Sequence, residues 1–259
     1  PDFMSNPGYI LPAMWHIAGD GRGDKNMVIV PYSDRLLLFS RYLQQLVMES
    51  IGKEKDLDGK TVEQGLNVFG NKGGTDAHAF IQQLNDGRDD FFVTFIEVWK
   101  DKLDLPIENG VSMGDYLHGF QAGLATALKN KGRQVIEMRV RDTDEFNLGM
   151  LIALYERAVA VYAEFVHINA FHQPGVQAYK LASKTVIDTI LELNKKLAGM
   201  VGFEGSMEEL LAKAGLKDSA AAPGIVEKFA ENSGSRGGNS FSLSRRNDGG
   251  KWVYSVGKF

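Results

Sequence analysis

Residues 27–69 read MVIVPYSDRLLLFSRYLQQLVMESIGKEKDLDGKTVEQGLNVF. The segment opens with a short apolar run at 27–30, continues with dense helical periodicity from Leu36 to Ile51, and closes with the strand-like run 66–69. A buried strand, a helix and a second buried strand in this order form the repeating unit of a parallel sheet. The segment therefore predicts an α/β fold.

The same alternation continues on both sides of this segment. Strands are predicted at 91–98 and 134–140, with a helix at 113–128 between them. Further helices are predicted at 7–16, from near Asp76, at 146–168 and at 175–197. We therefore expect a mostly parallel sheet with helices on both faces, in which ligands bind at the carboxyl ends of the strands.

The composition changes after the glycine-rich stretch 199–205, which predicts a linker. This divides the chain into a first domain, residues 1–200, and a small winged-helix-like appendage, residues 206–259. The elements predicted for the appendage are a capping box at 206–209, short helices near Leu210 and Ile225, and a hairpin over 241–255 that turns at Asp248-Gly249.

The overall composition is that of a folded globular protein. The chain has 259 residues, of which 44% are hydrophobic and 10% aromatic, so it can bury a sizeable core. Its net charge of -4 creates no field that would attract nucleic acid or an anionic membrane. It has no cysteine, which excludes disulfides, thiolate nucleophiles and cysteine metal sites.

Targeting segments are not evident in the sequence. We find neither a signal peptide nor an apolar stretch of the roughly 20 residues that span a bilayer. These features predict a soluble protein of the cytoplasm, with a plastid as the other compartment considered. The chain begins with Pro1 and not with methionine, which fits a fragment of a longer protein.

Glu49 is the first candidate for catalysis. It lies four residues after Gln45 on the predicted helix, so a carboxylate and an amide share one helix face. Where such a face meets a cleft, Glu49 can act as a general base that Gln45 positions. The alternative interpretation is an ordinary polar helix face.

His78 is the second candidate. It ends the string GNKGGTDAH at 70–78, which follows a strand and opens a helix. The glycines allow close approach of a ligand, and the free N–H groups at a helix start favour anions. A histidine in the first helical turn is biased toward the neutral form, which exchanges protons with substrate oxygens. The alternative is a capping or core histidine.

Lys180 is the third candidate, at the end of the string FHQPGVQAYK at 171–180. Pro174 fits the first position of a helix, which places Gln173, Gln177 and Lys180 on one face. A lysine there can bind an oxyanion or exchange a proton with a hydroxyl. The alternative is a solvated lysine whose stem covers apolar surface.

Other catalytic classes find no support in the sequence. The remaining histidines share no regular metal-ligand spacing; they are His16, His118, His167 and His172. No His-Glu-x-x-His string, Gly-x-Ser-x-Gly elbow or Walker loop is present. We expect neither a metal nor an organic cofactor.

The tail carries a modest basic cluster, which consists of Arg236, Arg245, Arg246 and Lys251. Such a cluster near a wing can touch nucleic acid. The acidic overall charge favours a solvated structural hairpin instead, and we do not expect a nucleic-acid partner.

Three long strings, in the same order, resemble glucose-6-phosphate isomerase, above all its plastid and cyanobacterial branch. They are PYSDRLLLFSRYLQQLVMESIGKEKDLDG at 31–59, GNKGGTDAHAFIQQL at 70–84 and LIALYERAVAVYAEFVHINAFHQPGVQAYK at 151–180. The resemblance runs from near Pro1 to about Lys196. The third string ends in the family signature Gln-x-Gly-Val-Glu-x-x-Lys, with Gln177 in place of the glutamate.

The resemblance implies a second sugar-isomerase (SIS-type) domain and assigns roles to the candidates. Glu49 would move a proton between C2 and C1 of the open-chain sugar phosphate through a cis-enediol. Gln45 and Gln173 would contact the substrate, and His78 and Lys180 would assist ring opening. The histidine would come from the neighbouring subunit of a homodimer.

Part of the family pattern has no counterpart here. The first sugar-isomerase domain, with its Ser/Thr-rich phosphate loop and Gly-Gly-Arg segment, is missing. Orientation of substrate is worth roughly 7–11 kcal/mol, whereas general acid–base catalysis gives about 10²–10⁴-fold. We therefore expect little isomerase activity from this chain without an N-terminal half, from the same gene or a separate chain. The alternative is a non-catalytic module that binds sugar phosphates.

Overall fold

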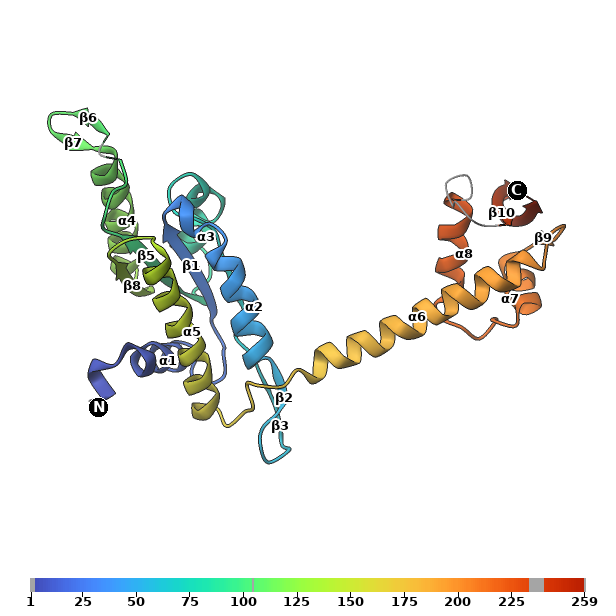
Figure 1. Cartoon of the computed structure of the whole chain (residues 1–259), viewed down its shortest axis with the longest axis horizontal. Coiled ribbons are helices and arrows are strands. Elements are labelled where there is room, and N and C mark those ends of the chain that lie inside the picture. The colour runs from blue at the N-terminus through green and yellow to red at the C-terminus, as the bar shows by residue number, and fades with distance from the viewer. Residues whose placement is uncertain (1–2, 104, 233–239, 259) are drawn as a thin grey trace. The chain divides into compact units, whose positions relative to one another are not determined.

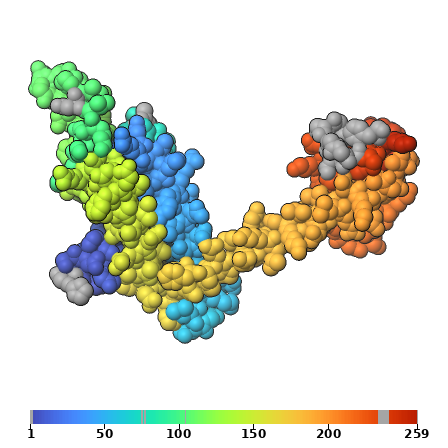
Figure 2. Space-filling model, in the orientation of Figure 1, coloured from blue at the N-terminus to red at the C-terminus, as the bar shows by residue number. Residues whose placement is uncertain are grey.

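The computed structural model describes residues 3–103, 105–232 and 240–258. The chain divides into two compact units, Pro1–Gln173 and Pro174–Phe259 (Figure 1). Figure 2 shows the atoms of both units, blue to yellow for the first and orange to red for the second. Each unit is described by itself below.

A four-stranded parallel sheet forms the centre of the first unit (Figure 1). Its strands, in spatial order, are β4 (Val68–Gly70), β1 (Asn26–Tyr32), β5 (Phe91–Val98) and β8 (Gln134–Val140). All three pairings are parallel, which confirms the predicted sheet. The strands at 91–98 and 134–140 have the predicted bounds.

Helices cover both faces of the sheet, as predicted. The first face packs against α1 (Pro7–Ala18), α2 (Phe39–Ile51) and α5 (Glu145–Phe165), and we call it the α5 face. The second packs against α3 (Ile81–Asp86) and α4 (Met113–Asn130), and we call it the α4 face. Strand residues alternate between the faces because successive side chains of a strand point to opposite sides.

Strand β5 shows this alternation clearly. Phe92 and Ile96 belong to the core of the α5 face, whereas Val93 and Phe95 belong to the core of the α4 face. Glu97 continues the second series and is only 6% exposed. The strand therefore places one carboxylate inside the α4 face, close to the carboxyl end of the sheet.

Helix α5 corrects one expectation. It has 21 residues, and an 18-residue window within it has a mean hydropathy of 1.2, so the helix is long and apolar enough to cross a membrane by length and composition. The prediction that no stretch reaches this threshold was wrong. The apolar side chains of α5 pack in the core of the α5 face, where Tyr155 stacks on Trp15 of α1 at 5.8 Å. A core helix passes the same composition test because it is buried among apolar neighbours.

The segment that contains His78 also differs from the prediction. Thr75–Ala79 forms a short 3-10 helix, η3, and the α-helix begins only at Ile81. The backbone of Phe80, with φ -140° and ψ -9°, leaves the helical region and separates the two. His78 therefore does not lie in the first turn of an α-helix, and the helix-dipole argument does not apply to it.

Two small hairpins were not predicted. One pairs β2 (Lys53–Lys55) with β3 (Thr61–Gln64), and the other pairs β6 (Pro106–Glu108) with β7 (Val111–Ser112). The first is closed by Asp56, whose Oδ1 accepts hydrogen bonds from the backbone of Asp58 at 3.0 Å and Lys60 at 2.8 Å. These strands are short and mostly polar, so they lack the apolar pattern that marks a strand in sequence.

The second unit contains α6 (Pro174–Ala198), β9 (Glu204–Gly205), α7 (Met207–Ala214), α8 (Ala222–Glu231), β10 (Phe241–Asp248) and β11 (Lys251–Lys258). The capping box at Ser206 is confirmed, as are the two short helices and the hairpin. The last turns of α6 contribute Leu193 and Leu197 to the core of this unit. The compact units divide before α6, and the assignment of domains at 1–200 and 206–259 stays a prediction.

The hairpin turns one residue later than predicted. Asp248 pairs with Lys251, and the two-residue loop is Gly249-Gly250, with φ values of 59° and 91°. A tight hairpin turn requires positive φ at both central positions, which glycine adopts without strain. The two central positions of the turn are therefore occupied by Gly249 and Gly250 and not by Asp248 and Gly249.

Two basic residues of the tail, Arg245 and Arg246, are paired with carboxylates. Arg245 contacts Glu231 at 2.6 Å and lies 4.4 Å from the ring centre of Trp252, and Arg246 contacts Glu204 at 2.6 Å. Arg236 lies outside the described residues. These contacts agree with a structural role for the hairpin.

Candidate active site

Helix α2 positions Glu49. Leu43, Val47 and Ile51 are fully buried at four-residue spacing and attach the helix to the sheet. Glu49 and Gln45 lie outside this stripe, one turn apart, and the amide of Gln45 donates to Oε2 of Glu49 at 3.5 Å. The spacing prediction that these two side chains meet is confirmed.

A second amide reaches Glu49 from a distant part of the chain. Gln173, the last residue of the first unit, donates a hydrogen bond from Nε2 to Oε1 of Glu49. Each carboxylate oxygen of Glu49 thus accepts one amide proton and keeps lone pairs for a further donor. The arrangement fixes the carboxylate and leaves it partly exposed.

Lys53 lies beneath the end of α2 and was not identified from the sequence. Its ammonium donates to the backbone carbonyls of Glu49 at 2.9 Å and Ser50 at 2.6 Å, and the residue is 3% exposed. Burial lowers the pKa of Lys53, and the nearby charge of Glu49 opposes that shift. A lysine directly after the last turn of a helix, with Gly52 as the C-cap, is the signal that could have revealed this contact.

His78 lies at another cavity. This cavity, of about 650 Å³, is also lined by Tyr32, Gly73 and the ion pair of Lys72 with Asp34 at 2.6 Å. Gly73 donates its N–H to the carbonyl of Pro31 at 2.7 Å, and a Cβ on it would lie 2.3 Å from the ring of Tyr32. Gly73 therefore allows the close approach of a side chain of the same chain, and approach of a ligand to this loop stays a prediction.

Topology separates His78 from Glu49 within one chain. Helix α2 connects the carboxyl end of β1 to the amino end of β4, because the two strands are parallel. Glu49, in the last turn of α2, therefore lies toward the amino edge of the sheet. His78 follows the carboxyl end of β4 and lies at the opposite edge.

Lys180 belongs to the second unit. It is exposed on α6, three residues after Gln177. Pro174 is the first residue of α6, as predicted. The relation of Lys180 to Glu49 stays a prediction.

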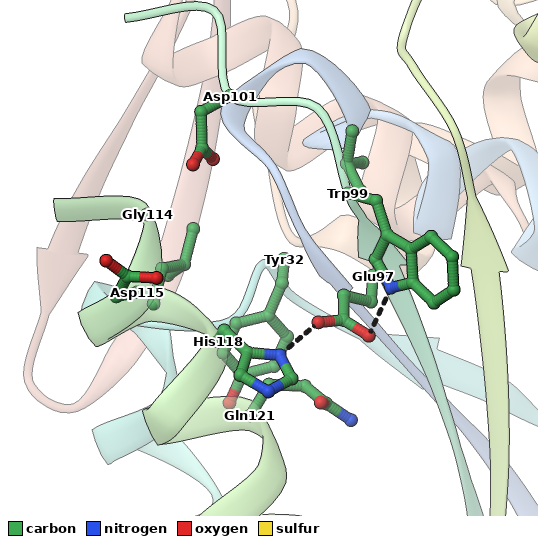
Figure 3. Close-up of a pocket in the computed structure, with 10 residues that line it drawn as sticks. Tyr32, Glu97, Trp99, Asp101, Gly114, Asp115, His118 and Gln121 are labelled. Atoms are coloured by element: carbon green, nitrogen blue, oxygen red, sulfur yellow. Dashed lines mark hydrogen bonds and ion pairs between the residues drawn. The ribbon is translucent and has the colours of Figure 1, made fainter. Parts of the chain in front are cut away.

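A carboxylate–imidazole pair at the carboxyl edge was also missed (Figure 3). Glu97 Oε1 accepts from Nδ1 of His118, and its Oε2 accepts from Trp99 and from Arg139, each at 3.2 Å. Burial by itself would raise the pKa of Glu97, but these donors outweigh it and the pKa lies below its ordinary value. A single charge inside the apolar run 91–98 is the sequence signal that could have identified this residue.

No group of three or more His, Asp or Glu side chains among the residues that the structure describes is arranged to hold a metal ion.

The parallel sheet with helices on both faces, and polar side chains gathered at its ends, define an α/β domain with layers of helices on either side of the sheet. Among solved structures, a glucose-6-phosphate isomerase from Chlamydia trachomatis has a TM-score of 0.60 and 23% sequence identity. That match covers 71% of this chain and 38% of the other. A hypothetical protein from Thermus thermophilus has a TM-score of 0.63 over 70% of this chain and 45% of its own, at 23% identity.

Sequence comparisons give the family. The model of the phosphoglucose isomerase family matches residues 10–139, half of the chain. A glucose-6-phosphate isomerase of Nostoc punctiforme is 48% identical over 227 residues, and one of Geobacter sulfurreducens is 55% identical over 186 residues. The chain belongs to the phosphoglucose isomerase family.

The matches cover only part of these relatives. They include 86% of this chain but 42% of the Nostoc protein, and 71% of this chain but 35% of the Geobacter protein. The chain thus spans less than half the length of the curated relatives that it matches.

Proposed function

We propose that this chain supplies the general base of a glucose-6-phosphate isomerase, which interconverts glucose 6-phosphate and fructose 6-phosphate. The observation that carries the proposal is the double amide clamp on Glu49, formed by Gln45 and Gln173. A positioned carboxylate with free lone pairs is what proton transfer at a carbon next to a carbonyl requires. Family membership supplies the substrate class.

In the proposed mechanism, Glu49 removes the proton from C2 of the open-chain sugar. Electrons of the broken C–H bond form the cis-enediol as the carbonyl oxygen at C1 takes up a proton. Glu49 then returns its proton to C1 while the hydroxyl at C2 releases its proton, and the C2 oxygen becomes the ketone oxygen of fructose 6-phosphate. The two amides hold the carboxylate in one orientation, so the same oxygen can serve both carbons. During ring opening, Lys180 and His78 would exchange protons with the ring oxygen and a hydroxyl of the cyclic sugar.

A homodimer follows from this assignment. Because Glu49 and His78 lie toward opposite edges of one sheet, the histidine that serves a given Glu49 would come from the second subunit. The topology supports this arrangement, and the family resemblance implies it. Gln177 replaces the glutamate of the family signature. The negative charge that the family pattern places beside Lys180 is therefore absent here.

The phosphate group needs a further partner. We propose that an N-terminal half, from the same gene or a separate chain, provides the phosphate loop and the arginine for the enediolate. The match covers 42% of the Nostoc protein, and the remainder of that relative supports the proposal that a further half takes part. We expect the complete enzyme in the cytoplasm.

Reconstitution tests the proposal. The chain is assayed for conversion of fructose 6-phosphate with and without the N-terminal half of the Nostoc relative, together with exchange of the C2 proton for solvent deuterium. We expect turnover and exchange only in the reconstituted enzyme. Substrate binding without exchange in the reconstituted enzyme would favour a non-catalytic sugar-phosphate module instead.

A further inference from the structure

Lys53 donates hydrogen bonds to the carbonyl groups that end helix α2. The last carbonyls of an α-helix have no partner within the helix and carry the negative end of its dipole. The ammonium of Lys53 bonds two of them, the carbonyl oxygen of Glu49 at 2.9 Å and that of Ser50 at 2.6 Å. A cation therefore closes the turn that carries the proposed base.

The buried position of this ammonium is costly. Lys53 is 3% exposed, and its hydrogen-bond partners among the described residues are backbone carbonyls. Burying an ammonium that has no carboxylate in direct contact is unfavourable, and an apolar side chain would fill the same space without that cost. An exposed lysine could also bond the last carbonyls of a helix. The buried charge is therefore more than the stability of α2 requires.

Glu49 is held at both ends. Gln45 and Gln173 donate to its carboxylate, and Lys53 donates to its backbone carbonyl. The amides fix the direction of the carboxylate, and Lys53 fixes the backbone from which the side chain extends. A displacement of about 1 Å in a reacting group can cost roughly 10²-fold in rate. The last turn of α2 must therefore keep its place during proton transfer.

The hairpin of β2 and β3 fixes the position of Lys53 itself. Lys53 is the first residue of β2 and pairs with Gln64 of β3. In the loop between the two strands, the N–H of Leu57 donates to the carbonyl of His167 at 2.9 Å. His167 belongs to the segment that leads from α5 to Gln173. One hairpin thus contacts both the turn that carries the base and the loop that carries one of its amide partners.

We propose that Lys53 is a positioning residue of the isomerase, whose buried ammonium keeps the last turn of α2, and with it the carboxylate of Glu49, in place for proton transfer. This inference rests on the proposed function of Glu49. Lys53 acts through the backbone of Glu49 and exchanges no proton with the substrate. A lysine that serves only as a helix cap would change the stability of the fold and leave turnover as it is.

The variant Lys53→Met tests the inference in the reconstituted enzyme. Methionine keeps an unbranched side chain and removes the three N–H donors. We expect kcat to fall about tenfold, because the last turn of α2 loses part of its fixed geometry. KM should stay within about twofold, because Lys53 does not contact the substrate. Lys55→Met, at an exposed lysine of the same strand, is the control and should keep both constants.

Hydrogen exchange of the full 259-residue chain measures the turn itself. In Lys53→Met the amides of residues 50–52 should exchange about tenfold faster, the effect of losing a hydrogen bond from a charged group. In Lys55→Met they should keep their rates. Faster exchange with an unchanged kcat would make Lys53 a helix cap only and overturn the inference. A lower kcat without faster exchange would also overturn it, because Lys53 would then act by a route other than this turn.

A second variant carries the test if Lys53→Met does not fold. Lys53→Gln keeps two N–H donors on a side chain that reaches one bond less far, so we expect a fall in kcat of about threefold and faster exchange of the same amides. Unchanged kcat and exchange in Lys53→Gln would overturn the inference. An unaltered reconstituted enzyme without turnover contradicts the proposed function of Glu49, whereas an active enzyme that is insensitive to Lys53→Met contradicts only the role of Lys53.

Discussion

Gln173 donates its side-chain amide to the carboxylate of Glu49, which lies 124 residues earlier in the chain. The contact joins the end of the loop after α5 to the last turn of α2. It also places the residue directly before α6 at the proposed catalytic base. A side chain on a loop thus takes part in orienting a side chain on a helix.

Loss of the base should abolish turnover. In the reconstituted enzyme, Glu49→Gln keeps the shape of the side chain and removes its basicity, so kcat should fall by roughly 10²–10⁴-fold. Exchange of the C2 proton with solvent should fall in parallel. Glu54→Gln, an exposed carboxylate five residues further on, is the control and should keep full activity. Full activity of the Glu49→Gln variant would remove Glu49 from the role of base.

Loss of the amide from the loop should reduce turnover without unfolding the chain. Gln173→Ala removes one of two donors to Glu49, so we expect kcat to fall about tenfold, as for one hydrogen bond to a charged group. The melting temperature should not change, because Gln173 is exposed. Gln173→Glu should move the pH–rate profile toward higher pH, because a second carboxylate disfavours the ionised form of Glu49. If kcat and the pH profile are unchanged in both variants, the hydrogen bond from Gln173 to Glu49 has no role in catalysis.

Gly73 should tolerate no side chain. In Gly73→Ala the new Cβ meets the ring of Tyr32 at 2.3 Å, and we expect a destabilisation of about 1–3 kcal/mol from overpacking. Gly119→Ala, in the interior of α4 with nothing within 4 Å of its Cβ, should instead stabilise by roughly 0.5–1 kcal/mol. Urea unfolding of both variants measures the difference. Equal effects would mean that the loop moves to accommodate the methyl group.

Acid should destabilise the first unit through Asp142 and Glu97. Hydrogen bonds, first from Lys102, hold the pKa of Asp142 well below its ordinary value of 3.8, against the opposing effect of burial. The pKa of Glu97 lies below its ordinary value of 4.5. A carboxylate whose pKa is lower in the folded state stabilises the fold above the unfolded pKa and loses this effect as the pH falls. Stability should therefore decrease from about pH 4.5 downward.

The variant Asp142→Asn checks this assignment. Its urea midpoint should lie below that of the unaltered chain at pH 7, and the gap should narrow toward pH 3. Asp218→Asn should show no such gap at either pH. A constant gap for Asp142→Asn across this range would assign its effect to packing and not to charge.

Local patterns account for most of the fold that was predicted. The strands at 91–98 and 134–140 were identifiable because they are short apolar runs between turn residues, and both faces of the sheet are covered. The helix expected from Asp76 was wrong because the backbone of Phe80 interrupts it, and single-residue geometry of this kind has no compositional signal. The hairpin turn lies at Gly249-Gly250, one residue after the predicted Asp248-Gly249. Glycine adopts the positive φ that both central positions of the turn require without strain.

The candidate site was only partly accessible to such reasoning. Gln45 and Glu49 share a helix face by spacing, so their contact followed from four-residue periodicity. Gln173 reaches Glu49 through tertiary structure alone, and only the family resemblance indicated its role. Lys53 and Glu97 were missed because their significance lies in burial, which residue type does not reveal.

The course of α2 from one edge of the sheet to the other has a genetic consequence. Under the proposed dimer, a subunit that has lost Glu49 and a subunit that has lost His78 carry complementary defects. Random pairing of the two makes half of the dimers mixed, and each mixed dimer holds one intact centre, which restores roughly a quarter of full activity. Two damaged alleles in one cell would rescue each other, whereas either allele alone would leave the cell without the enzyme.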